Sequence, residues 1–133
     1  MTEKLELYKC NICGNLVQVI LNGEGELVCC GQPMEHLIPQ GVNEGVNKEV
    51  NNPLTEKHTP AIEERDGERF VTLKYHPMIP EHYIQFIEVY PKDKSALHLK
   101  YLKPDDIAEF NITGLEEDID ALEMCNIHGL WKG

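Results

Sequence analysis

Four of the five cysteines of this 133-residue chain lie within its first 30 residues, as a CxxC pair (Cys10, Cys13) and an adjacent pair (Cys29, Cys30). A segment of about 40 residues buries too little apolar surface to fold without a cross-link. The four thiols can supply that cross-link by binding one metal ion, because the free energy of metal binding then becomes free energy of folding. We therefore expect residues 1–37 to form a small metal-stapled module.

The spacing of these cysteines also constrains the metal site. Each pair is followed by a glycine (Gly14 and Gly31), which permits a tight turn after the second thiol. Four thiolates around one ion indicate tetrahedral zinc or iron, and the spacing alone leaves both metals open. Neighbouring residues of an extended chain point in opposite directions, so Cys29 and Cys30 can bind one ion only where the backbone bends.

The rest of the chain is rich in strand patterns. Within the first module, residues 16–21 and 26–29 flank an Asn-Gly-Glu-Gly turn and predict a hairpin. Prolines, glycines and asparagines break every periodic pattern over residues 38–57, which we expect to be a linker. Short strands separated by turn residues then predict an antiparallel β-sandwich over residues 58–133, at 69–75, 83–90, 96–102, 108–112 and, where a helix is also possible, 116–124.

A second group of metal-binding residue types lies in this strand-rich part: His58, His76, His82, Cys125 and His128. His76 and His82 flank a connection that two prolines stiffen, so both imidazoles can be presented from one end of a hairpin. Cys125 and His128 are three residues apart before a glycine, which is a common spacing for metal ligands. His36 and His98 belong to no such pattern, and we interpret them as structural.

These motifs resemble those of a known family. Tyr8 to Pro33 resemble desulforedoxin and the N-terminal domain of desulfoferrodoxin, and the words EKHTP, HPMIPEHYI and CNIHGLW resemble the catalytic domain of superoxide reductases, also called neelaredoxin. The chain is thereby identified as a member of the two-iron superoxide reductases of the desulfoferrodoxin type. The resemblance implies an all-β chain: a desulforedoxin-like Fe(Cys)4 domain at 1–37, a linker at 38–57 and an immunoglobulin-like catalytic β-sandwich at 58–133.

The resemblance also implies the chemistry. One iron would be held by Cys10, Cys13, Cys29 and Cys30, and the catalytic iron by four equatorial histidines with Cys125 as the axial ligand and the sixth position open. Superoxide would be reduced there to hydrogen peroxide without release of dioxygen. Lys57 would steer superoxide and help to deliver protons, and Glu56 would be the carboxylate that can occupy the sixth position of ferric iron. A rubredoxin-like electron donor and a homodimer are implied in the same way.

Charge and cysteine content limit the partners and the compartment. The 12 basic and 23 acidic residues give a net charge of −11, which disfavours nucleic acid and anionic membranes. The chain shows no secretory signal or membrane span, and its odd number of cysteines suits metal binding in the cytoplasm better than disulfides. Besides a reductase, the residues leave open an electron carrier without a substrate, a structural metal module, and a dismutase on the same scaffold.

Overall fold

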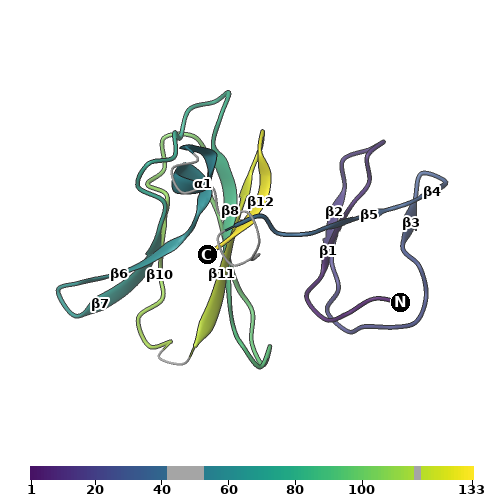
Figure 1. Ribbon diagram of the computed structural model, residues 1–133, viewed down its shortest axis with the longest axis horizontal. Helices are drawn as coiled ribbons and strands as arrows, with labels where there is room; N and C mark the ends of the chain where they lie inside the picture. Colours follow the sequence, from purple (N-terminus) through teal and green to yellow (C-terminus); the bar gives the residue numbers. More distant parts are fainter. Residues whose placement is uncertain (42–52, 116–117) are drawn as a thin grey trace. The chain divides into compact units, whose positions relative to one another are not determined.

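The computed structural model describes residues 1–41, 53–115 and 118–133 (Figure 1). The chain divides into two compact units, Met1–Ile38 and Pro39–Gly133. Strands and turns make up nearly all of the described residues, with a six-residue helix, α1 (Pro53–His58), as the exception. The predicted all-β class is therefore confirmed. Most of the predicted linker lies outside the described residues, and no helix in the described part has the length and apolarity needed to cross a membrane.

The first unit contains two small sheets. Its strands are β1 (Leu7–Lys9), β2 (Leu16–Gln18), β3 (Val28–Cys29), β4 (Gln32–Pro33) and β5 (Glu35–Leu37). They pair in the orders β2-β1-β5 and β3-β4, so the predicted hairpin between residues 16–21 and 26–29 does not form. The CxxC turn already joins β1 to β2, through bonds from Cys10 N to Asn15 O (2.9 Å) and from Gly14 N to Cys10 O (2.9 Å). Each cysteine pair thus lies in or beside its own tight turn.

The second unit is a sandwich of two antiparallel sheets. Its strands in the described residues are β6 (Ala61–Arg65), β7 (Glu68–Thr72), β8 (Ile84–Pro91), β9 (His98–Tyr101), β10 (Glu109–Asn111), β11 (Ile119–Cys125) and β12 (Gly129–Lys132). One sheet has the order β10-β7-β6 and the other β12-β11-β8-β9. Val71 and Ile112, beside or on the first sheet, join Ile87, Val89 and Ala121 of the second in one buried cluster. This three-plus-four division is that of an immunoglobulin-like sandwich.

The pairing of β8 with β11 contains an irregularity near the histidines. Met124 lies opposite Phe86, but Cys125 lies opposite Ile84, which leaves Gln85 without an opposite residue on β11. Such a β-bulge shifts the alternation of side chains by one residue. Ile84 and Ile87 therefore both belong to the buried cluster although they are three residues apart. In Figure 1, α1 is drawn at the level of the upper parts of β8 and β12.

Candidate metal centres

The first candidate centre is formed by the two cysteine turns of the first unit. The Sγ atoms of Cys10, Cys13, Cys29 and Cys30 all lie within 4.8 Å of one another. The Cys13–Cys29 and Cys29–Cys30 Sγ distances are 3.6 and 3.9 Å. Four thiolates with metal–sulfur bonds of about 2.3 Å in a tetrahedron lie about 3.8 Å apart, so the four sulfurs fit one ion.

The backbone bends where the adjacent cysteines require it. Cys30 has a φ of 53°, and Gly31 follows with 73°. Two successive left-handed residues are costly for a residue with a Cβ, and the glycine keeps the cost to a single position. This bend is what allows both neighbouring thiols to face one point, as the sequence predicts.

The four thiols share their protons unequally. The backbone N–H groups of Cys13 and Ile12 lower the pKa of Cys10 to about 6. Hydrogen bonding to Cys13, Cys10 and Cys29 raises the pKa of Cys30 to about 12. Cys10 is therefore a thiolate at neutral pH, whereas Cys30 keeps its proton in the absence of a cation. A bound cation takes the place of such shared protons, which is the usual coupling between metal binding and thiol ionisation.

The second candidate centre is a closed ring of four imidazoles in the second unit. Consecutive ring centroids in the order His58–His76–His82–His128–His58 are 4.6, 4.6, 5.1 and 4.8 Å apart, whereas His58 and His82, across the ring, are 6.1 Å apart. Consecutive rings stand at 81°, 73°, 65° and 77° to each other. The four side chains therefore surround one central point.

The nitrogens and the sulfur of this group lie at the separations expected of metal ligands. His76 Nε2 is 3.2 Å from His58 Nε2 and 3.3 Å from Cys125 Sγ, which is itself 3.8 Å from His128 Nδ1. The ligand atoms of His58, His82, Cys125 and His128 all lie within 4.8 Å of one another. Adjacent ligands on an ion with metal–nitrogen bonds of about 2.1 Å lie about 3 Å apart. The buried Nε2 of His82 has no hydrogen-bond partner among the described residues, as expected of a nitrogen aimed at an ion.

Burial keeps two of these imidazoles, those of His76 and His82, in their metal-binding form. It lowers the pKa of His76 to about 4, with further contributions from His58, His82 and His128. The pKa of His82 is lowered by burial, by His128 and by Lys57. Both rings are thus neutral at pH 7, and neutral imidazole is the form that binds divalent metals. His76 Nδ1 lies 2.6 Å from Pro77 O and donates to it, which leaves Nε2 as the ligand atom.

Two opposing effects act on the pKa of the Cys125 thiol. Burial raises the pKa of this thiol, and hydrogen bonds from the backbone N–H groups of His128 and Ile127 lower it. The distance from His128 N to Sγ is 3.4 Å. Amide donors stabilise the negative charge of a thiolate. The turn after Cys125 therefore both supplies the candidate ligand His128 and stabilises the thiolate form of the cysteine.

Two residues that support this ring have no role predicted from the sequence. Trp131 stacks on His58, with ring centroids 4.8 Å apart, and its Nε1 donates to His128 O at 3.1 Å. Gln40 Nε2 donates to the same carbonyl at 2.8 Å, and its backbone forms a bridge with Trp131 on β12. Trp131 lies within the CNIHGLW motif, but nothing in the sequence connects Gln40 to a residue 88 positions away.

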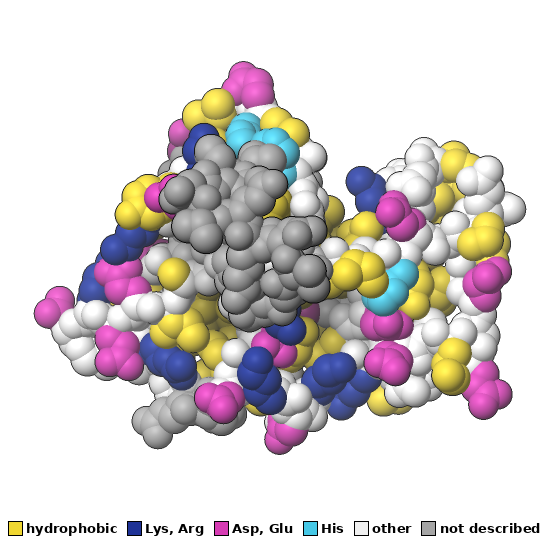
Figure 2. Space-filling view, viewed as in Figure 1, with side chains coloured by type: hydrophobic (Ala, Val, Ile, Leu, Met, Phe, Trp, Pro, Cys, Tyr) yellow, Lys and Arg dark blue, Asp and Glu magenta, His cyan; other side chains and the backbone are white. Residues whose placement is uncertain are grey.

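The two residues predicted to act on the substrate lie on α1, next to His58. Glu56 and Lys57 are both exposed, whereas His58 is fully buried. The positive charge of Lys57 contributes to the lowered pKa of His82. Glu56 lines a hollow with Lys74 and Tyr75, to which none of the five candidate ligands contributes. Histidine side chains reach the surface of the second unit beside hydrophobic and basic ones in Figure 2.

Comparison with known proteins gives a separate match for each of the two parts of the chain. A β-sandwich that carries a cluster of four histidines and one cysteine, joined to a module with four clustered cysteines, defines a class of non-haem metalloproteins with two metal-binding sites. Residues 2–37 match the family described as "Desulfoferrodoxin, N-terminal domain", and residues 50–133 match "Desulfoferrodoxin". The chain belongs to the desulfoferrodoxin family.

Individual relatives agree with this assignment. The chain is 41% identical to a desulfoferrodoxin homolog of Archaeoglobus fulgidus, over 99% of this chain and 98% of the relative. It is 33% identical over 97 residues to a superoxide reductase of Pyrococcus horikoshii, which covers 58% of this chain and 84% of that protein. The solved superoxide reductase of Treponema pallidum shares the fold, with a TM-score of 0.67 at 24% identity over 98% of both chains.

Proposed function

We propose that the chain is a superoxide reductase that converts superoxide to hydrogen peroxide at the second centre without releasing dioxygen. The observation that carries the proposal is the ring of four imidazoles with a buried cysteine sulfur 3.3 Å from the nearest ligand nitrogen. Membership of the desulfoferrodoxin family and the similarity to a protein named superoxide reductase support it.

The residues of the second centre have different roles in the proposed reaction. The four imidazoles and Cys125 would hold ferrous iron, which would supply the electron that superoxide takes up. The thiolate would donate electron density to that metal, as cysteine does in thiolate-ligated haem enzymes. The amides of Ile127 and His128 moderate that donation by hydrogen bonding to the sulfur. One superoxide, one electron and two protons give one hydrogen peroxide.

Lys57 is the residue that we propose to attract superoxide and to pass protons toward it through water. The effect of its positive charge on His82 supports this role, because exposed charges farther than about 8 Å away are screened at physiological salt. We propose that Glu56, which lies on α1 two residues before His58, is the carboxylate that would bind the iron in its ferric form, and membership of the desulfoferrodoxin family supports that role.

The same proposal includes the domain boundaries, the electron donor, the cellular location and the oligomeric state. Residues 1–37 form the Fe(Cys)4 domain, 38–57 the connection and 58–133 the catalytic domain, with two irons in each chain. A rubredoxin-like carrier returns the electron after each turnover. The five cysteines, free of disulfides, are compatible with a cytoplasmic location, and exposed apolar side chains on the small first unit, such as Ile12, Ile20 and Val28, are compatible with a homodimer.

The stoichiometry of the reaction tests the proposal. The pre-reduced protein is mixed with superoxide, and peroxide and dioxygen are measured for each superoxide consumed. We expect one peroxide per superoxide and no dioxygen. Half a peroxide with dioxygen would instead indicate a dismutase, and no consumption above background with both irons bound would favour an electron carrier.

A further inference from the structure

Asn126 occupies an unusual position in the ladder between β8 and β11. β11 ends at Cys125, opposite Ile84, so the next residues to pair are Asn126 and Tyr83. Asn126 N donates to Tyr83 O at 3.1 Å, as in a regular hydrogen-bonded pair. The return bond is different, because Tyr83 N donates to the side-chain Oδ1 of Asn126 at 2.9 Å. The side chain thereby takes the place of its own backbone carbonyl.

Because the Asn126 side chain accepts this bond in place of the backbone carbonyl, the chain is able to turn at this residue. A regular pair would hold the backbone of Asn126 in the strand, whereas the chain must turn here to bring His128 back to the ligand Cys125. The side-chain bond lets the backbone leave the ladder while the N–H of Tyr83 stays satisfied.

The other end of the same amide reaches the opposite side of a ligand. Asn126 Nδ2 donates to Glu81 O at 3.2 Å. Glu81 and Tyr83 are the two chain neighbours of His82, so the bonds made by Asn126 hold the backbone on both sides of that histidine. One residue thus connects the segment that carries Cys125 and His128 to the segment that carries His82.

We propose that Asn126 is a positioning residue for the second metal centre, which fixes His82 relative to Cys125 and His128. The proposal rests on the ligand set proposed above. Asparagine suits the position because its acceptor and its donor are both used. Aspartate can accept from Tyr83 N but cannot donate to Glu81 O, and alanine can do neither.

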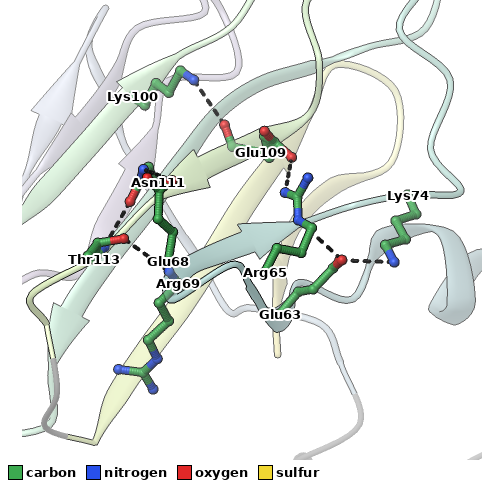
Figure 3. Close-up of polar contacts among 9 residues, drawn as sticks. All are labelled: Glu63, Arg65, Glu68, Arg69, Lys74, Lys100, Glu109, Asn111 and Thr113. Carbon is green, nitrogen blue, oxygen red and sulfur yellow. Dashed lines mark hydrogen bonds and ion pairs between the residues drawn. The ribbon is translucent and has the colours of Figure 1, made fainter.

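The test compares Asn126→Ala and Asn126→Asp with a matched control, Asn111→Ala. Asn111 also uses both ends of its amide, with Nδ2 donating to Glu68 Oε2 (3.2 Å) and Oδ1 accepting from Thr113 N (2.9 Å), but on β10 among residues that are not candidate ligands (Figure 3). The measurements are the rate at which a chelator removes iron from the second centre and the energy of the thiolate-to-iron absorption band. Neither involves superoxide, so the result does not depend on the proposed reaction.

We expect Asn126→Ala to release this iron about 10-fold faster or more, the size of effect seen when residues that orient metal ligands are lost, and to shift the absorption band. Asn126→Asp should lie between the wild type and Asn126→Ala, and Asn111→Ala should match the wild type in both measurements. A wild-type release rate and band in Asn126→Ala would overturn the proposal. If that variant does not fold, the same wild-type values in Asn126→Asp would overturn it.

Discussion

Lys57 is the basic residue that we propose to attract superoxide to a chain whose net charge is −11. An anionic substrate is repelled by such a chain at long range, but screening restricts that repulsion. The side chain of Lys57 is exposed, and its positive charge acts on His82 although the net charge of the chain is negative. The capture of superoxide should therefore depend on this one side chain more than on net charge.

Replacing Lys57 tests this local effect. We expect Lys57→Ala to slow superoxide capture about tenfold at low salt and to weaken its salt dependence, because the attracting charge is gone while the ligands are intact. The rate is measured by pulse radiolysis at several ionic strengths. Lys92→Ala is the control, since it changes the net charge equally but follows the end of β8 far from His82, where Lys92 pairs with Asp120. Equal slowing in both variants would mean that net charge, and not position, controls capture.

At the scale of single elements, β11 is buried along its whole length and yet carries a carboxyl group in its middle. All seven of its residues are buried, and both oxygens of Glu123 have no hydrogen-bond partner among the described residues. Burial raises the pKa of Glu123 to about 9. In the unfolded chain this carboxyl loses its proton near its ordinary pKa of 4.5. Between these two values the unfolded state binds fewer protons, so the contribution of Glu123 to stability is lost as pH rises.

Glu123→Gln should remove this pH dependence. We expect the wild type to lose stability relative to the variant by about 1.4 kcal/mol per pH unit between about pH 5 and 8. Chemical denaturation of the iron-loaded proteins across that range measures the difference. Glu64→Gln, at an exposed position of β6, should leave the slope unchanged. Parallel stability curves for the wild type and Glu123→Gln would contradict the assignment of the slope to this residue.

Strands with a buried apolar face can be predicted from the sequence, and others cannot. The pattern predicts β8 at residues 83–90, and the structure has it at Ile84–Pro91, because β-branched and aromatic residues predominate there. The strand predicted at 116–124 is β11, although residues 116–117 lie outside the described part of the chain. No pattern predicts β6, because most of its side chains are exposed. The candidate ligands are predicted from motifs that resemble those of a known family, whereas the support from Gln40 depends on a contact that no local pattern encodes.

At the scale of the whole molecule, each unit has its own metal-binding group and its own buried residues. The first buries Leu5, Leu7 and Val19 in the same unit as the four clustered cysteines, and the second buries the large cluster between its two sheets. With so few buried side chains, the first unit depends on its metal for stability far more than the second does. Loss of one metal should therefore not cause loss of the other.

Two cysteine variants test this independence. We expect Cys29→Ser to lose the first iron and to melt the first unit at a lower temperature, while the thiolate-to-iron band of the second centre stays unchanged. Cys125→Ser should show the reverse, with the band of the second centre lost and the first iron retained. Absorption spectra, iron content and calorimetry of both variants measure these outcomes. Loss of both irons in either variant would show that the units depend on each other.

The bulge at Gln85 acts as a half-period phase shift in β8. Side chains of a strand alternate between its faces with a period of two, so a strand in constant phase cannot place both Ile84 and Ile87 on the same face. After the bulge, Ile87 and Val89 are in phase with the sandwich core. Before it, Ile84 and the preceding residues toward His82 have the opposite phase. Deleting Gln85 would leave Ile84 and Ile87 two positions apart, so a regular strand would place both in the core and keep the pairing with β11 on each side.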